Sequence, residues 1–115
     1  MHQAWKIVSW NVNGLRAAEK KGFVDWLKQG GGDVVAVQET KARPEQLSAA
    51  LLQPHGYHAH WASAEKKGYS GVGTYSRHTP LNVSAGLNDT RFDSDGRVLI
   101  SEFEPFILLN SLETP

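Results

Sequence analysis

Cysteine is absent from this sequence of 115 residues, and its absence excludes several kinds of chemistry. Without thiols there is no disulfide framework, no thiolate zinc site and no thiol nucleophile. The net charge is zero, because 12 basic and 12 acidic side chains cancel, so bulk electrostatics favours no polyanionic partner. No apolar run approaches the ~20 residues that span a bilayer, and the first residues are not a signal peptide. We therefore expect a soluble, cytoplasmic protein with no membrane partner.

The residues that are present have the composition of one small globular domain, with 40% apolar and 21% charged side chains. Charge is unevenly distributed along the chain. Residues 1–43 carry 7 basic and 4 acidic side chains, whereas residues 78–115 carry 2 basic and 6 acidic ones.

Apolar patterning predicts alternating strands and helices in the first half of the chain. Residues 5–10 are β-branched and aromatic, and residues 34–37 form a continuous apolar run, as expected of a strand covered on both faces. Apolar residues at helical spacing predict a short helix over residues 23–27, ended by a glycine triplet. Pro44 can open a second helix, whose apolar stripe continues to residue 52.

The second half is predicted to be mainly antiparallel β-structure. A polar turn at residues 65–68 and a tight turn at residues 104–105 each join two strands, and a polar loop occupies about residues 87–96. The predicted strands are residues 57–62, 72–76, 97–103 and 106–109. The element order indicates an α/β fold with a mixed sheet.

One feature of this layout indicates that the chain is part of a larger domain. The apolar strand at residues 34–37 needs a layer on each face, and two short helices cover little more than one face. Nothing after Phe103 is expected to supply the second layer.

Polar residues follow the first two predicted strands at their carboxyl ends, where functional residues gather in open α/β sheets. If these strands are neighbours, Asn11, Asn13 and Glu39 converge on one rim. One carboxylate with amide neighbours suits Mg²⁺, which keeps several waters and also binds substrate phosphate oxygens. The alternative reading is that Glu39 caps a loop and the asparagines only form turns.

Basic residues beside small or aromatic ones form a second pattern, in loops. They occur at residues 16–21, at Lys41 with Arg43, and at residues 66–71. Lysines, exposed backbone N–H groups and a tyrosine could together hold a phosphate backbone. The alternative is that these segments are ordinary solvated turns.

The histidines form a third pattern, for which a structural reading is favoured. His58 and His60 share one face of a predicted strand, close to His55. No carboxylate or thiolate in that segment completes a tetrahedral zinc set, so half-exposed strand histidines are expected.

Taken together, the motifs resemble exodeoxyribonuclease III-type apurinic/apyrimidinic endonucleases. IVSWNVNGLRA at residues 7–17 is similar to their opening strand and loop, and VQETK at residues 37–41 to their metal-binding segment. KGYSGV at residues 67–72 resembles their DNA-facing hairpin, and residues 92–103 resemble their central strand. The order and spacing of these motifs match the family over nearly the whole chain.

The resemblance implies the N-terminal half of a DNase I-like four-layer α/β sandwich with two mixed, largely antiparallel sheets. It implies a Mg²⁺- or Mn²⁺-dependent phosphodiesterase of the endonuclease/exonuclease/phosphatase superfamily. Such enzymes cut double-stranded DNA 5′ to abasic sites, and many also act on 3′ ends as exonucleases and phosphatases. A bacterial-type, nucleoid-associated role in cytoplasmic DNA repair would follow.

The resemblance also assigns site residues by position. Asn11 and Glu39 would be catalytic, and Glu39, Asn11 and Asn13 would hold the metal. Together with the basic loops, it indicates a DNA-contacting set: Arg16, Ala17, Lys20, Lys21, Lys41, Gly68, Tyr69 and Arg97.

The chain departs from the family pattern at its end. Residues 110–115 (NSLETP) place Leu112 where the family's Asn-x-Tyr-x-Pro motif has its tyrosine, and they shift the proline by one position. The family's later Gly-Asp-x-Asn and Ser-Asp-His segments have no counterpart here, and none of the histidines replaces the catalytic one. Residues 1–115 are therefore expected to form a partial domain with impaired activity and an exposed sheet surface that could self-associate.

Three alternatives stay open: a catalytically dead DNA-binding fragment, a non-functional remnant, or a superfamily phosphodiesterase or phosphatase acting on a lipid or small molecule.

Overall fold

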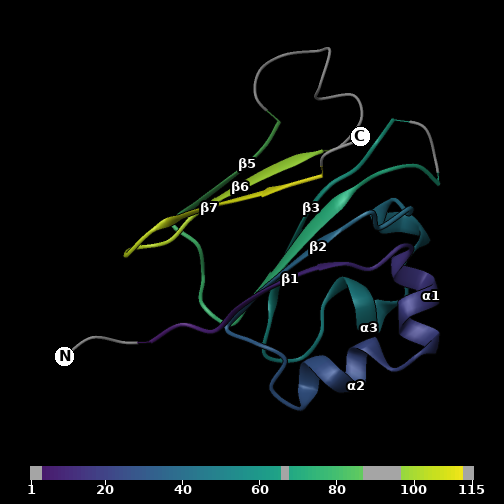
Figure 1. Cartoon of the computed structure of the whole chain (residues 1–115), viewed down its shortest axis with the longest axis horizontal. Helices are drawn as coiled ribbons and strands as arrows, with labels where there is room; N and C mark the ends of the chain where they lie inside the picture. Colours follow the sequence, from purple (N-terminus) through teal and green to yellow (C-terminus); the bar gives the residue numbers. More distant parts are fainter. Residues whose placement is uncertain (1–3, 66–67, 87–96, 113–115) are drawn as a thin grey trace.

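The computed structural model describes residues 4–65, 68–86 and 97–112, which form two β-sheets packed face to face with a helical layer on one outer side (Figure 1). The four-stranded sheet has the order β1-β2-β4-β3 and the three-stranded sheet has the order β5-β6-β7. The strands of the four-stranded sheet are β1 (Ile7–Asn11), β2 (Val34–Gln38), β3 (His58–Ala62) and β4 (Val72–Ser76).

The four-stranded sheet is mixed, as the sequence predicts. β1 pairs in parallel with β2, from Ile7 opposite Val34 to Asn11 opposite Gln38, whereas β4 is antiparallel to both β2 and β3. Strand β2 lies in the interior, and its four residues 34–37 are all buried. An apolar run without alternation therefore does mark a strand covered on both faces here.

Three short helices cover one face of this sheet: α1 (Leu15–Lys20), α2 (Phe23–Lys28) and α3 (Ala49–Leu52). Their buried side chains pack against β2 and Tyr75 of β4 in one core cluster. The Tyr75 hydroxyl donates a 2.7 Å hydrogen bond to the carbonyl of Leu51, which fixes α3 to the sheet. Burial, and secondarily Glu19, raises the pKa of Tyr75, so this hydroxyl keeps its proton.

The continuous helix expected over residues 44–52 is wrong. A 3₁₀ turn at Pro44–Gln46 is followed by extended backbone at Leu47 and Ser48, before α3 begins. The Ser48 hydroxyl accepts a hydrogen bond from the Leu51 N–H at 3.2 Å, as an N-cap serine does. The helix is broken because a good capping residue lies in the middle of the apolar stripe.

The second sheet consists of β5 (Asn82–Ala85), β6 (Val98–Glu102) and β7 (Ile107–Ser111), all antiparallel. A tight turn joins β6 to β7, and in it the Phe103 N–H donates to the Phe106 carbonyl at 2.8 Å. This sheet packs on the face of the four-stranded sheet opposite the helices (Figure 1). The expectation that nothing after Phe103 supplies a second layer is therefore wrong, because β7 follows Phe103 and forms this layer together with β5 and β6. The polar loop predicted at residues 87–96 lies outside the described residues.

One buried side chain joins the two sheets. Asn110 of β7 is 2% exposed, and its amide nitrogen donates to the Gly73 carbonyl at 2.9 Å and to the Thr74 hydroxyl at 3.2 Å. Its Oδ1 accepts a 3.0 Å hydrogen bond from the Gln38 side chain. A buried amide with this many partners fixes the register of β7 over β2 and β4, because any slip would leave polar groups unpaired.

Aromatic rings close the end of the sandwich where β6 turns into β7. The Trp5 ring lies 4.2 Å from His78, 5.5 Å from Phe103 and 4.9 Å from Phe106, measured between ring centroids. This aromatic cluster links the N-terminal segment to both sheets.

The described residues therefore contain a helical layer and two sheet layers of the expected four-layer fold. On β7, the last strand of the second sheet, Ile107 is 66% exposed and Leu109 is 57% exposed. Among the described residues no helix is long and apolar enough to cross a membrane.

Candidate functional site

The carboxyl ends of β1 and β2 lie at the same edge of the sheet, since the two strands are parallel neighbours. Their backbones stay paired beyond the strands. The Val12 N–H donates to the Gln38 carbonyl at 3.1 Å, Gly14 N–H to Glu39 at 2.8 Å, and Leu15 N–H to Thr40 at 2.9 Å. The loop after β1 and the loop after β2 therefore run side by side at this rim.

A third loop, which precedes β4, closes over the same place. The Thr40 N–H donates to the Gly71 carbonyl at 3.0 Å, and the Lys41 N–H donates to the Ser70 carbonyl at 2.8 Å. Thr40 is 2% exposed, and a Cβ atom on Gly71 would lie 2.2 Å from its hydroxyl oxygen. Glycine at position 71 is therefore required for the close approach of this loop to residues 39–41.

The backbone at this rim carries unusual conformations. Among the described residues, the non-glycine positions with positive φ are Asn13 (50°), Glu39 (58°), Lys41 (53°) and Ser70 (47°). All four belong to these three loops. Left-handed backbone in L-residues costs on the order of 1 to 3 kcal/mol and persists where the surroundings enforce it, which is common at functional sites.

One ammonium group lies between two of the polar side chains at the rim. Lys41 Nζ donates a 2.6 Å hydrogen bond to Asn13 Oδ1 and lies 3.9 Å from Glu39 Oε2. The Asn11 side chain braces the same loop, because its Oδ1 accepts a 3.0 Å hydrogen bond from the Asn13 N–H. The sequence predicted that Asn11, Asn13 and Glu39 converge. It did not predict that Lys41 points at them.

The donor set at this rim fits a hard divalent cation. Glu39 offers a carboxylate whose side chain is 32% exposed, and the two asparagines offer amide oxygens. The described residues contain no group of three or more His, Cys, Asp or Glu side chains that could hold a metal ion. Mg²⁺ needs no such cage, since one or two carboxylates, waters and substrate phosphate oxygens complete its shell. The role of each residue as a ligand stays a prediction.

Three of the four predicted DNA-contacting residues in and just after α1 contact this rim or line a cavity with it. Arg16 donates from Nη2 to the Lys41 carbonyl at 3.3 Å, and Lys20 is exposed on α1. Ala17 and Lys21 line a cavity of about 440 Å³ together with Asn13. The remaining lining residues are Trp10, Val12, Ala18, Gly22, Phe23 and Trp26.

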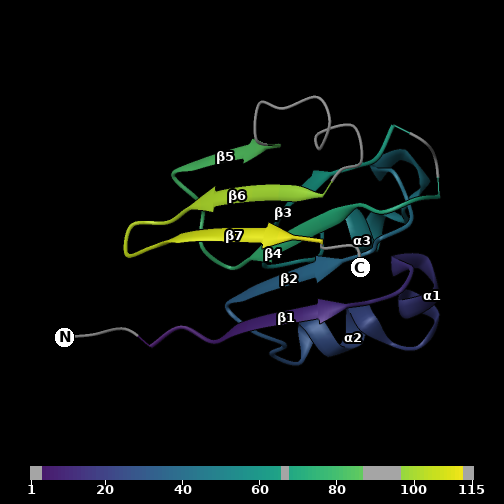
Figure 2. The same cartoon turned by 45° about the horizontal axis from the view of Figure 1, so that its top comes forward.

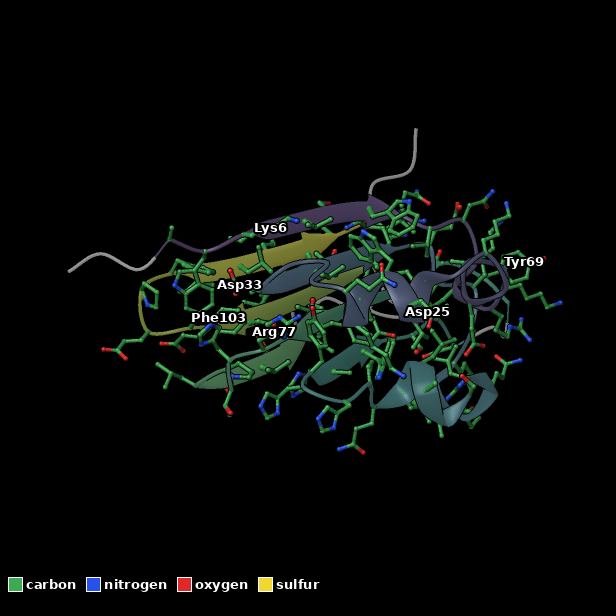
Figure 3. The ribbon with its side chains drawn as sticks, turned by 90° about the horizontal axis from the view of Figure 1, so that it is seen from below. Lys6, Asp25, Asp33, Tyr69, Arg77 and Phe103 are labelled. Atoms are coloured by element: carbon green, nitrogen blue, oxygen red, sulfur yellow. The ribbon has the colours of Figure 1, made fainter. Side chains whose placement is uncertain are left out.

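The other predicted contacts come from the later part of the chain. Tyr69 is 57% exposed and lies at the end of the molecule opposite Phe103 (Figure 3). Gly68 has a φ of 82°, and Lys66 and Lys67 lie outside the described residues. The Arg97 carbonyl accepts a 2.8 Å hydrogen bond from the Leu112 N–H where β7 ends. The arrowheads of β1, β2 and β7 point the same way in Figure 2, so Arg97 belongs to the same end as Glu39.

The histidines lie elsewhere on the sheet. His58 is exposed and His60 is half-buried on the edge strand β3, and His58 Nε2 shares a 3.1 Å hydrogen bond with the Thr79 hydroxyl. Burial, and secondarily His58, lowers the pKa of His60. Neither histidine belongs to the rim formed by the three loops.

Sequence reasoning missed two residues that shape this site, Thr40 and Gly71, and also the buried Asn110 that joins the two sheets. A glycine that follows a serine in a hairpin could have signalled a close backbone approach at position 71. Nothing in the sequence signals the burial of Thr40 and Asn110, because polar residues are usually exposed.

The sequence of the chain is related to those of known proteins. Residues 8–112 match the sequence model of the Endonuclease/Exonuclease/phosphatase family, and the chain belongs to this family. It is 45% identical over 100 residues to the exodeoxyribonuclease of Bacillus subtilis (strain 168), covering 86% of this chain and 38% of that protein. It is 42% identical over 108 residues to the DNA repair nuclease APEX1 of Danio rerio, covering 92% of this chain and 35% of that protein.

Solved structures give the same relationship. An AP endonuclease from Archaeoglobus fulgidus superposes with a TM-score of 0.78 at 29% identity, covering 95% of this chain and 41% of that one. The 3′ phosphatase NExo from Neisseria, bound to a product DNA hairpin, superposes with a TM-score of 0.76 at 31% identity, covering 92% and 40%. The chain thus has the fold of these DNA-processing enzymes and spans less than half the length of the relatives it matches.

Proposed function

We propose that this chain provides the metal-binding and DNA-contacting N-terminal part of a DNA-repair nuclease. The reaction is metal-dependent hydrolysis of the phosphodiester 5′ to an abasic site, with 3′→5′ exonuclease activity. The observation that carries the proposal is the position of the Glu39 carboxylate where three loops meet, 3.9 Å from the Lys41 ammonium that also contacts Asn13. Arg16 adds a second cationic residue here through its hydrogen bond to the Lys41 carbonyl. The names of the relatives support the same reaction class.

In this proposal each residue at the rim has a definite task. Glu39 and the amide oxygens of Asn11 and Asn13 would hold Mg²⁺ or Mn²⁺, which supplies charge stabilisation at the scissile phosphate when bound. Asn11 keeps the Asn13 backbone in place through its 3.0 Å hydrogen bond. The residues that bind and orient the DNA backbone are Arg16, Ala17, Lys20, Lys21, Lys41, Gly68, Tyr69 and Arg97.

We propose further that residues 1–115 are a partial domain whose hydrolysis is slow in isolation. The chain covers 38% of the Bacillus subtilis relative, and the segments that the family resemblance assigns to the nucleophile and the histidine have no counterpart in it. A partial domain of a bacterial-type repair nuclease would act in the cytoplasm on double-stranded DNA.

Self-association is a second part of this proposal. Ile107 and Leu109 expose large apolar side chains on the terminal strand of the three-stranded sheet. Such patches favour association. Sedimentation across a concentration series tests it, and a monomer at all concentrations contradicts it.

The first experiment measures Mn²⁺ affinity by calorimetry or electron paramagnetic resonance. We expect Glu39→Gln to weaken binding by about tenfold or more, which corresponds to about 1.4 kcal/mol, because the only predicted carboxylate ligand is lost. Glu45→Gln is the matched control, since Glu45 is exposed, belongs to the 3₁₀ turn and pairs with Arg43 at 2.9 Å. Equal affinity of the wild type and Glu39→Gln would contradict the metal assignment.

DNA binding is then measured on a duplex with one abasic site, in EDTA, across a salt series. Each lysine that contacts a phosphate should lower the slope of log affinity against log salt by about 1 when it is removed. Nicking of the same duplex with Mg²⁺ tests catalysis. Binding without nicking would identify a DNA-binding part of a nuclease, and metal-dependent nicking lost in Glu39→Gln would show that the missing segments are dispensable.

A further inference from the structure

The Lys41 side chain lies at the place where the metal ligands converge. Its ammonium is 2.6 Å from Asn13 Oδ1 and 3.9 Å from Glu39 Oε2, so it contacts two of the three proposed ligand residues. The nearness of Lys41 to Glu39 in sequence does not explain the contact with Asn13, which comes from a different loop.

The Lys41 backbone is held by neighbouring residues, whereas its side chain is partly exposed. Its N–H donates to the Ser70 carbonyl at 2.8 Å, its carbonyl accepts from Arg16 at 3.3 Å, and its φ is 53°. The side chain itself is 44% exposed. A flexible four-carbon stem on an anchored backbone can carry the ammonium between Asn13 and solvent without disturbing the loop.

We propose that Lys41 is an internal cation that competes with the divalent metal for Asn13 and Glu39 and turns toward the substrate phosphate when the metal binds. This inference rests on the proposed function, since it takes Asn13 and Glu39 as metal ligands. The contact between Lys41 and Asn13 then belongs to the metal-free site. Contact between Lys41 and DNA, which the sequence predicted, belongs to the metal-loaded site.

The argument for competition is electrostatic and geometric. The short hydrogen bond directs an Asn13 oxygen lone pair at the ammonium, and the same ammonium faces the only carboxylate of the ligand set. A divalent ion held by Asn13 and Glu39 would lie within a few ångströms of Nζ, where like charges repel strongly in a partly desolvated site. Release of Lys41 removes that repulsion and provides a cation for a phosphate oxygen.

Competition of this kind couples the two ligands of the site. Metal binding frees Lys41 for phosphate, and by linkage phosphate binding must favour the metal by the same factor. Lys41 would therefore make the site prefer metal and nucleic acid together over the metal alone.

The test compares Mn²⁺ affinity in the wild type, Lys41→Gln and Lys28→Gln. We expect Lys41→Gln to bind Mn²⁺ about fivefold more tightly or better, within the usual range for coupled sites. Lys28→Gln removes the same net charge at the end of α2 and should leave the affinity unchanged. Far-UV circular dichroism and the urea midpoint establish that each variant is folded. Unchanged or weaker binding in Lys41→Gln would overturn the inference.

A second readout separates displacement from simple charge repulsion. In nuclear magnetic resonance spectra of the wild type, saturating Mg²⁺ should shift the Asn13 side-chain amide and the Lys41 ε-methylene signals as their hydrogen bond breaks. Lys41 signals that stay unchanged under saturating Mg²⁺ would overturn the proposal even if Lys41→Gln binds more tightly.

The Glu39→Gln variant distinguishes failure of the metal assignment from failure of the Lys41 competition. If it binds Mn²⁺ as the wild type does, the metal assignment itself fails; if it alone loses binding and Lys41→Gln behaves as the wild type, only the competition fails.

Discussion

The two ends of this sandwich are constructed differently. At one end Trp5, His78, Phe103 and Phe106 bring their rings together around the tight turn between β6 and β7. At the other end three loops meet through main-chain hydrogen bonds, left-handed backbone and one ammonium group between Asn13 and Glu39. The aromatic end contains no left-handed non-glycine residue among the described positions, whereas the loop end contains four.

In the proposed function, this difference separates the residues that stabilise the fold from the residues that bind the metal and DNA. At the aromatic end Phe103 is buried and the other three rings are half-buried, and the apolar area that they remove from water stabilises the fold. Strained backbone and partly exposed polar groups at the loop end lower stability, and they persist because neighbouring loops hold them. Substitutions at the two ends should therefore have separable effects on the free energy of unfolding and on metal affinity.

The largest loss of stability is expected from Phe103→Ala. Phe103 is 3% exposed and contacts both Trp5 and Phe106, so its truncation should lower the free energy of unfolding by about 3 kcal/mol. Mn²⁺ affinity of the folded fraction should not change. Urea denaturation measures the first effect and calorimetry the second. Leu81→Ala is the control, since Leu81 is 67% exposed. A change in metal affinity in Phe103→Ala would break the separation of the two ends.

Gly71→Ala should combine an intermediate loss of stability with a loss of metal affinity. The new Cβ would meet the Thr40 hydroxyl, and φ is +93°, so we expect a cost of about 2 to 3 kcal/mol and a displaced Glu39. Gly68→Ala is the matched control: φ is +82° there, but nothing lies within 4 Å of the new Cβ, so the cost should be about 1 kcal/mol. Equal urea midpoints for the two variants would show that the contact with Thr40 is unimportant.

The smallest effect on stability is expected at His60, which belongs to neither of the two ends of the sandwich. Burial lowers the folded-state pKa of His60 below its ordinary 6.5, so the unfolded state takes up the proton first. Stability should therefore fall as pH drops through 6.5 and level off below the folded-state pKa. In His60→Gln this part of the pH dependence disappears, which urea midpoints at about pH 7.5 and about pH 5.5 would reveal. The exposed His55→Gln should behave as the wild type, and an unchanged pH profile in His60→Gln would show that its burial has no energetic consequence.

The sequence predicts the fold best where apolar runs are strong. The strands at β1, β2, β4 and the β6–β7 hairpin follow from short apolar segments bounded by turn formers. Helix α1 and strand β5 were not predicted. α1 has six residues and its N-cap is Gly14, which offers no side-chain cap, and β5 has four residues with only Val83 partly buried. Such elements form because neighbours pack against them, so local sequence carries little signal for them.

The candidate site was predictable in its topology and unpredictable in its side-chain geometry. Parallel pairing of β1 and β2 brings Asn13 and Glu39 to one rim whatever the loop conformations are. The contact from Lys41 depends on left-handed backbone at both Glu39 and Lys41, which non-glycine residues adopt only when tertiary contacts require it. The sequence identifies Asn110 only as part of a terminal motif. Its burial between the sheets follows from packing that no single segment reveals.

Four main-chain hydrogen bonds tie residues 39–41 to Gly14, Leu15, Ser70 and Gly71. These bonds affect the conformational entropy of the loop. Ordering one residue of a flexible loop costs roughly 1 to 2 kcal/mol of conformational entropy at room temperature. Here that entropy is already lost when the chain folds, because the loop is tied to both of its neighbours. An ion that binds at Glu39 need not order the loop around itself. If the proposed metal binds at this rim, discrimination between ions therefore depends on charge, dehydration and coordination number, and not on the conformational entropy of the segment that holds them.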